Sequence, residues 1–467
     1  MKRNFLTVIT ALAAVFFMGA TIVSADVEFG GQFRPRLEVS DKDFNGMTDA
    51  NTFIQSRIRL DTKVTADDNI SAFFQLQSTP TWGFDSAVFG ASDSSTNIHL
   101  NARGGDKSVT IHQAYVVLGN FFGMPVDLKL GRQEIIFDGH RIVGNTGWTA
   151  GAVRHDAIRL DHGNDTYGVT YVFSKASEFI GALGADDVND TSWHMFHFTL
   201  KELLGGKLSA ILVATVDNLG DGAGPGGADL DNTYYTFGVR QAGSLSGFSW
   251  RVEAYYQAGD ADLCGDGSCV LPSAADTPGW DRSAYMAGVR AGYKFDVATA
   301  PSITLWFDYL SGDDNLADKD INQFNTLLDT GHKYYGFMDQ FLGVGNGAVA
   351  GSTRGLGLMD LAIKTSISPM ENLLVKADIH SFYTAEDAQA GIAAIPGSGV
   401  PASEVGENHL GEEVDLTLVH TYSESTKIIV GYSHFFGTDL MASMPGRTIA
   451  ANPDDADWGY VMVDFKY

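Results

Sequence analysis

The sequence has little cysteine, proline or positive charge, and after residue 25 it has no long apolar run. It contains 467 residues with 2 cysteines and 12 prolines, and its net charge is −26. Such an acidic chain argues against a nucleic-acid partner, because nucleic-acid binding depends on basic surfaces. Beyond residue 25, no stretch approaches the roughly 18 consecutive apolar residues that a membrane-spanning helix needs.

The first 25 residues have the pattern of a secretory signal peptide. Two basic residues precede an apolar run from about residue 5 to residue 23, and Val-Ser-Ala at 23–25 fits a signal-peptidase site. We therefore expect the mature chain to begin near Asp26 and to form one domain over residues 26–467. An exported chain without spanning helices is either a soluble protein or a membrane β-barrel.

Recognisable catalytic motifs are absent from the sequence as well. We find no G-x-S-x-G, H-E-x-x-H or P-loop pattern and no C-x-x-C-H haem motif. His194 and His197 are three residues apart on a predicted strand, which places them on opposite faces and makes a shared metal unfavourable. We expect no enzyme activity and no cofactor. Cys264 and Cys269 are predicted to form a short loop disulfide, because an exported protein can be oxidised.

Apolar and polar residues alternate with a period of two along most of the chain after residue 25. Phe33 and Leu37 share one face of a predicted strand, for example, and Arg34 and Arg36 share the other. Segments of about ten such residues are typical of transmembrane β-barrels, with apolar side chains toward lipid. A soluble sandwich also alternates, but so many basic residues on one face would crowd a dry core. The sequence therefore predicts an all-β, antiparallel barrel of about eighteen strands, near residues 26–40, 51–65, 69–79, 108–119, 125–133, 153–162, 165–175, 191–200, 207–216, 232–242, 247–258, 281–295, 302–311, 354–367, 372–383, 409–421, 424–436 and 457–467.

The predicted connections alternate in length, which is a property of bacterial barrels with short periplasmic turns and long outer loops. The short turns lie near 66–69, 162–165, 243–247, 369–372 and 423–426. The long loops lie near 80–107, 134–152, 176–190, 217–231, 259–280, 312–353, 384–408 and 437–456. We expect the chain to begin and end on the periplasmic side.

Many basic residues fall on the polar face of the predicted strands, which would line the lumen. A basic lumen of low dielectric attracts anions, and arginine suits carboxylates, while interleaved acids such as Glu253 and Asp308 allow the solute to leave. The alternative is that these arginines only pair with lumen acids in a structural lattice. Excess acid lies in the outer loops, where it is either solvated or bridges divalent cations to lipid head groups. The basic residues predicted to line the pore are Arg34, Arg36, Arg57, Arg59, Lys129, Arg159, Arg240, Arg251, Arg290, Arg354 and Lys364.

The segment LKLGRQEIIFDGHRIVGNTGWTAGAVRHDAIRL (128–160) resembles the signature of the alginate-export family of outer-membrane porins. RIRL (57–60), GHKYYGFMD (331–339) and HLGEEVDL (409–416) agree with that family in the same order. The resemblance implies an eighteen-stranded barrel whose arginine-lined constriction passes anionic polyuronate. The residues of this sequence that match the central motif are Arg132, Glu134, Arg141, Asn145, Trp148, Asp156 and Arg159. Of these, the resemblance implies that Arg132, Glu134, Arg141, Asp156 and Arg159 line the pore.

We therefore expect a channel in the outer membrane of a Gram-negative bacterium, in contact with lipid and lipopolysaccharide. It would pass anionic small molecules or an acidic polysaccharide such as alginate, passively and down a gradient. The alternatives are a general porin, a barrel closed by the 312–353 loop that acts as a binding or scaffold protein, and a conduit around an electron-transfer partner. The oligomeric state is open, and so is the role of Arg132 and Arg141, which either reach the constriction or brace the loop that forms it.

Overall fold

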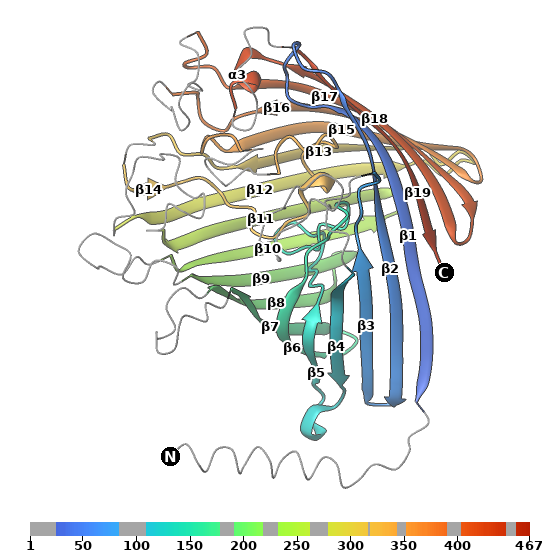
Figure 1. Ribbon diagram of the computed structural model, residues 1–467. Coiled ribbons are helices and arrows are strands. Elements are labelled where there is room, and N and C mark those ends of the chain that lie inside the picture. The colour runs from blue at the N-terminus through green and yellow to red at the C-terminus, as the bar shows by residue number, and fades with distance from the viewer. Residues whose placement is uncertain are drawn as a thin grey trace.

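In the computed structural model, one antiparallel sheet closes into a barrel (Figure 1). The structure describes residues 25–83, 109–177, 191–217, 232–261, 279–315, 318–342, 352–389, 403–444 and 454–467. The sheet has 19 strands, of which β14 has only two residues and pairs in parallel with the first two residues of β12. The other eighteen pair with their neighbours along the chain, and the first pairs with the last, so the barrel is closed.

The strands of the barrel are long, and most of the connections on one side are tight. Their bounds are β1 (Asp26–Asp41), β2 (Asn51–Asp67), β3 (Ile70–Ser78), β4 (Thr110–Leu118), β5 (Asp127–Gln133), β6 (His155–Gly163), β7 (Tyr167–Ser177), β8 (Thr191–Leu203), β9 (Gly206–Asp217), β10 (Tyr234–Leu245), β11 (Phe248–Asp260), β12 (Asp281–Lys294), β13 (Ser302–Leu310), β14 (Asp320–Ile321), β15 (Leu358–Met370), β16 (Leu373–Tyr383), β17 (His409–Ser423), β18 (Thr426–Gly437) and β19 (Ala456–Lys466). Short helical turns are η1 (Phe121–Gly123), η3 (Gly331–Lys333) and α3 (Asp439–Ala442). Among the described residues, no helix is long and apolar enough to cross a bilayer.

These strands confirm the predicted barrel of eighteen strands and the alternation of long and short connections. One predicted boundary is wrong: the strand expected from residue 354 begins at Leu358. The cause is local backbone geometry, because Arg354, Gly355 and Gly357 all have positive φ angles, which a strand cannot accommodate.

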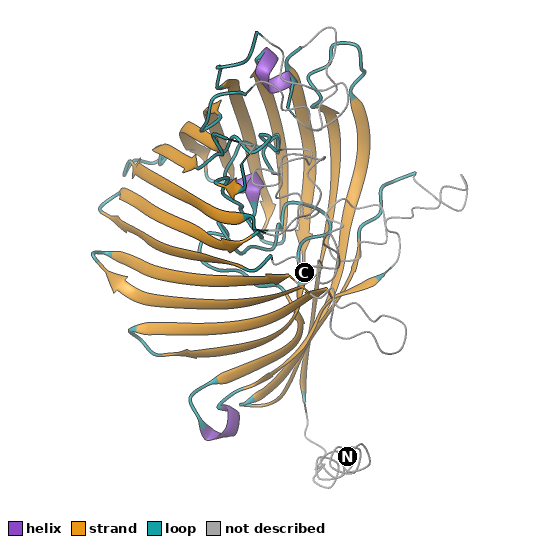
Figure 2. Cartoon of the chain, turned by 90° about the vertical axis from the view of Figure 1, so that its left-hand side faces the viewer, coloured by secondary structure: helices purple, strands orange, loops and turns teal. Residues whose placement is uncertain are grey.

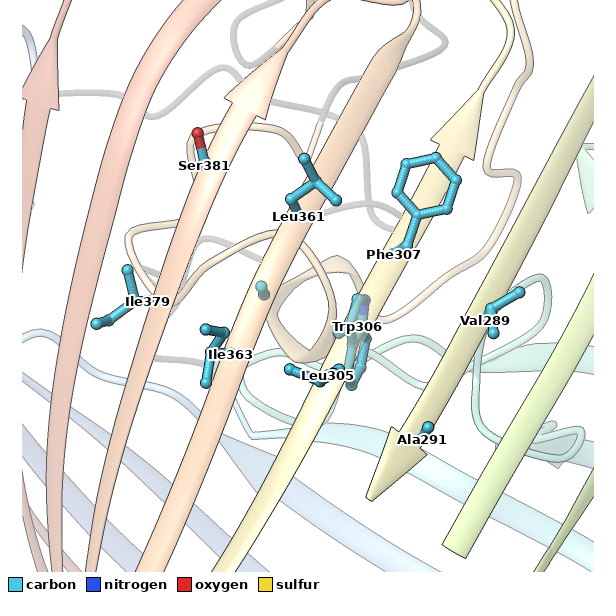
Figure 3. Close-up of a pocket in the computed structure, with 10 residues that line it drawn as sticks. Val289, Ala291, Leu305, Trp306, Phe307, Leu361, Ile363, Ile379 and Ser381 are labelled. Atoms are coloured by element: carbon cyan, nitrogen blue, oxygen red, sulfur yellow. The ribbon is translucent and has the colours of Figure 1, made fainter. Parts of the chain in front are cut away.

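The two faces of the strands differ as the alternation predicts. On β1, Phe33 and Leu37 are exposed on the outside, whereas Arg34 and Arg36 are buried inside. Figure 3 shows part of the outer, lipid-facing surface, where side chains of β12, β13, β15 and β16 surround an apolar pocket of about 530 Å³. Lipid chains favour such a surface because it exposes almost no polar groups.

Two long loops fold into the barrel and meet there (Figure 2). We call residues 134–154, between β5 and β6, the first inward loop, and the described parts of 311–357, between β13 and β15, the second. Val143 and Leu328 form a parallel bridge between the loops, supported by a hydrogen bond of 2.7 Å from the Gly144 N–H to the Leu328 carbonyl. Two loops that are joined to each other therefore lie inside the barrel.

Candidate functional site

The first inward loop is held against β1 and β2 by arginines. Arg34 donates hydrogen bonds to the carbonyls of Gly147 at 2.9 Å and Trp148 at 2.8 Å. Arg57 donates to the carbonyl of Ala150 at 2.9 Å and also reaches Gly147. Guanidinium groups have several donors in a fixed fork, so a few of them can secure an irregular backbone segment.

Arg36 completes this set, which we call the arginine brace (Arg34, Arg36 and Arg57). Its guanidinium lies over the Trp148 ring at 4.3 Å, donates to the Trp148 carbonyl and pairs with Glu38 at 2.7 Å. On the Trp148 ring, His332 of the second inward loop stacks with ring centroids 4.0 Å apart. The brace therefore holds the first loop, and the first loop holds the second.

Glu134 anchors the start of the first inward loop. Its carboxylate contacts His112 at 2.7 Å and Arg59 at 3.3 Å, and it accepts a hydrogen bond from Asn145 at 2.7 Å. Burial alone would raise the pKa of Glu134, but the hydrogen bond to His112 and the charge of Arg59 lower it to about 2. Glu134 therefore remains a fixed negative partner for Arg59.

The tip of the first inward loop crosses to the opposite side of the lumen, where Arg141 is almost completely buried. Its Nη2 lies 3.2 Å from Glu253 Oε1 on β11 and 2.5 Å from Asp308 Oδ2 on β13. The guanidinium also lies 3.7 Å from the ring centroid of Tyr334 in the second inward loop. Burial alone would lower the pKa of Arg141, but the neighbouring acids hold it well above its ordinary value.

Three arginines of β10, β11 and β12 surround the same two acids, and we call Arg240, Arg251 and Arg290 the basic wall. Arg251 and Arg290 are direct cross-strand partners. Like charges in this position destabilise a sheet, and they persist here beside acidic neighbours. Glu253 lies 3.6 to 3.8 Å from all three guanidinium groups.

Several donors of the basic wall have no acceptor among the described residues, and one acceptor beside them, Asp308 Oδ1, has no donor there. The side chain of Arg290 is only 6% exposed, yet its Nε and Nη1 have no hydrogen-bond partner among the described residues, and the same holds for Arg240 Nε. The guanidinium of Arg290 lies against the face of Trp306, whose indole N–H donates to Asp308 at 2.9 Å. Buried donors without acceptors are rare in proteins, so the wall is suited to an incoming anion.

Gly288 makes room for this arrangement, because it lies between Glu253 and Asp308 in the register of the sheet. A Cβ atom at this position would lie 2.6 Å from Asp308 Oδ1 and 3.1 Å from the Glu253 Cγ. A larger residue would push apart the two acids that bind Arg141.

Three further predicted residues face inward and have partners of their own. Lys364 pairs with Asp378 at 3.3 Å, and Arg159 forms two hydrogen bonds with Asp161. The Nζ of Lys129 lies 3.7 Å from the centre of the Tyr115 ring.

Arg132, Asp156 and Arg354 were expected to line the pore, and the structure places them elsewhere. Arg132 and Asp156 form a two-bonded ion pair on the outward face of β5 and β6, which they share with Leu130 and Ile158. The side-chain period of two explains this, since Lys129 on the same strand faces inward. Arg354 is fully buried in the loop before β15, where it donates to the Ser443 carbonyl.

Several residues of the site were not identified from the sequence, including Trp306, Tyr334 and His197. Strand alternation puts Trp306 on the same face as Asp308, so the sequence could have identified Trp306 as inward-facing. No local pattern reveals which side chains a loop contacts across the lumen. His194 lies outward beside Tyr171 and His197 is buried inward, as expected. Cys264, Cys269 and residues 1–24 lie outside the described residues.

Comparisons with known proteins agree with this geometry. A family model described as alginate export matches residues 25–452. The crystal structure of Acinetobacter baumannii OccAB1 aligns with a TM-score of 0.60 at 10% identity, covering 96% of this chain and 98% of that one. Acinetobacter baumannii OccAB4 aligns at 0.56 with 11% identity over 96% and 100% of the two chains. Pseudomonas aeruginosa OccK2 (OpdF) in complex with glucuronate aligns at 0.52 with 10% identity over 94% and 96%. At these identities the likeness shows the fold alone. No curated protein sequence matches the chain.

Proposed function

This chain belongs to the alginate-export family and is an integral outer-membrane channel for solutes, and we propose that its solutes are anions that pass along the basic wall. The observation that carries the proposal is that Arg290 and Arg240 have buried donors without a hydrogen-bond partner among the described residues. A carboxylate would accept hydrogen bonds from such donors and would be drawn to their charge.

The charge balance at the wall supports anions over cations. Four guanidinium groups, those of the wall and of Arg141, lie around the two carboxylates of Glu253 and Asp308. The excess positive charge lies inside the barrel, where a low dielectric would strengthen its attraction for anions. The two acids keep the attraction moderate, which permits the solute to leave.

Acidic sugars are the solute class that we propose within this function. Trp306, which is only partly buried, places an aromatic ring beside the guanidinium groups of Arg251 and Arg290. A uronate has a carboxylate for arginine and apolar ring faces for an aromatic side chain, so both parts would find a partner.

The experiment is a reversal-potential measurement in planar bilayers with a salt gradient across the membrane. We expect the wild type to prefer chloride over potassium, and Arg251→Gln with Arg290→Gln to reduce that preference several-fold. Arg132→Gln, on the outward face, is the matched control and should leave it unchanged. Cation preference or absence of conductance in the wild type would overturn the proposal.

A barrel closed by its second inward loop is a second candidate, favoured by how that loop packs. Tyr335 and Phe341 are buried, and the Met338 N–H donates to Glu413 on the inner face of β17 at 2.8 Å. Deleting residues 331–341 should raise the conductance many-fold if the loop closes the pore. An unchanged conductance would reject this candidate.

A further inference from the structure

Asp138, at the tip of the first inward loop, lies in a pocket of donors on the β8–β10 side of the barrel. Its carboxylate contacts His197 Nε2 at 2.9 Å, Ser209 Oγ at 2.7 Å and Lys207 Nζ at 2.9 Å, with Arg240 at 3.9 Å. Burial alone would raise the pKa of Asp138, but the contacts with His197, Ser209 and Lys207 lower it below its ordinary value, so the side chain is a carboxylate anion.

The donors come from three neighbouring strands whose register brings them together. Ser209 on β9 is the direct partner of Arg240 on β10, and Lys207 lies two residues further along the same face of β9. His197 comes from β8. Since all of them belong to the barrel wall, the pocket does not depend on the loop for its construction.

The loop that supplies Asp138 has a strained tip. Asp138 and His140 both have positive φ angles, 47° and 68°, which cost free energy in residues with a side chain. A Cβ on Gly139 would lie 2.9 Å from the Tyr334 hydroxyl and 3.0 Å from Arg251 Nη1, so the tip is pressed against the basic wall. The contacts of Asp138 and Arg141 therefore hold the tip in a conformation that it would not adopt alone.

We infer that Lys207, Ser209, His197 and Arg240 form a binding site for a carboxylate of the passing solute, which the chain's own Asp138 occupies until the solute displaces it. This inference rests on the proposed function, because it requires an anionic solute. The exchange replaces one carboxylate by another, and no covalent bond changes.

The position of Arg240 connects this site to the basic wall. Its guanidinium lies 3.9 Å from Asp138 and 3.8 Å from Glu253, so it can contact a carboxylate on either side. Lys207 has a side chain that is 41% exposed, which makes the site reachable from the lumen. A solute leaving Arg251 would therefore find its next partners in the pocket that Asp138 fills.

The test compares block of chloride current by sodium glucuronate in the wild type and in Asp138→Asn. Asp138 is tethered to the chain and competes with the solute at an effective concentration in the millimolar range. Removing its charge should therefore lower the half-blocking concentration of glucuronate about ten-fold. Asp156→Asn, an aspartate on the outward face, is the matched control and should behave as the wild type. Glucose, which has no carboxylate, should block Asp138→Asn no more strongly than the wild type.

A second variant keeps the test decisive if Asp138→Asn does not insert as a folded barrel. Lys207→Met changes an accessible side chain and should raise the half-blocking concentration several-fold, alone and together with Asp138→Asn. Equal block in Lys207→Met and the wild type would overturn the carboxylate site, and so would unchanged block in a folded Asp138→Asn. Cation preference in the wild type would instead overturn the proposed function.

Discussion

The arginine brace and the basic wall have the same residue type on the same inward face, but their surroundings differ. Arg34 and Arg57 of the brace donate mainly to backbone carbonyls of the first inward loop. Arg251 and Arg290 of the wall lie beside carboxylates and an aromatic face, and Arg290 has donors left over. Inward-facing arginines in this barrel are therefore not equally available to a solute.

The difference lies in which acceptors each set meets. A backbone carbonyl cannot leave its loop without unfolding it, so the brace is occupied permanently and has a structural role. Carboxylates of side chains leave room for a second anion, especially where guanidinium groups outnumber them.

The largest effect is expected for Arg141→Met, because Arg141 joins the loop held by the brace to the acids of the wall. Its loss would remove the nearest cation from the buried carboxylates of Glu253 and Asp308 and leave the more distant Arg290 as their shared partner, at a cost of about 3–5 kcal/mol. The measurement is the midpoint of unfolding in denaturant. Adding Glu253→Gln should recover part of the loss, and a midpoint equal to that of the wild type would show that the two regions are not coupled.

Arg57→Ala should have the next largest effect, and only on the brace. It removes charged hydrogen bonds to the Gly147 and Ala150 carbonyls. Because Arg34 still donates to Gly147, the net loss should be that of one charged hydrogen bond, about 1.5–3 kcal/mol. We expect faster amide hydrogen exchange in residues 147–151 and noisier conductance. The reversal potential should stay the same, since the wall is intact. If Arg57→Ala shifted the reversal potential as much as Arg251→Gln with Arg290→Gln, the brace and the wall would not differ in function.

A smaller effect is expected from pH, acting through Asp329 of the second inward loop. Burial raises its pKa from the ordinary 3.8 to about 7, although the charge of Arg141 lowers it. Between these values the folded protein binds a proton that the unfolded chain does not, so the stability of the loop should fall as the pH rises from about 4 to 7. The measurement is the protection of the amides of residues 328–335 against hydrogen exchange, relative to the unfolded chain, at pH 5 and at pH 8. Asp329→Asn should have the same protection at both pH values. If that variant loses as much protection at pH 8 as the wild type does, another group is responsible.

The smallest effect is expected for Arg132→Ala. Arg132 lies on the outward face of β5 and belongs to neither the brace nor the wall. Its partially exposed ion pair with Asp156 contributes about 0–1 kcal/mol. Stability, conductance and reversal potential should all remain close to those of the wild type. A clear change in anion preference would place Arg132 in the solute path and contradict its outward orientation.

Much of the fold could be predicted from the sequence because strand periodicity is local. Alternation alone identifies the eighteen strands and correctly places Arg36, Arg251 and Glu253 on the inner face. The same rule should have excluded Arg132, which has the parity of Leu128 and Leu130, but the family motif favoured it as a pore residue. Arg354 was misplaced because its positive φ angle cannot be seen in a pattern of polarity.

The sequence by itself determined the barrel, its two faces and the side of the wall on which each strand arginine lies, because side-chain direction follows from a period of two. Only the tertiary structure decided which partner each arginine has. Arg34 meets the Trp148 carbonyl 114 positions away, and Arg141 meets Asp308 167 positions away. Such contacts depend on where a folded-in loop ends in space, and no local pattern encodes that position.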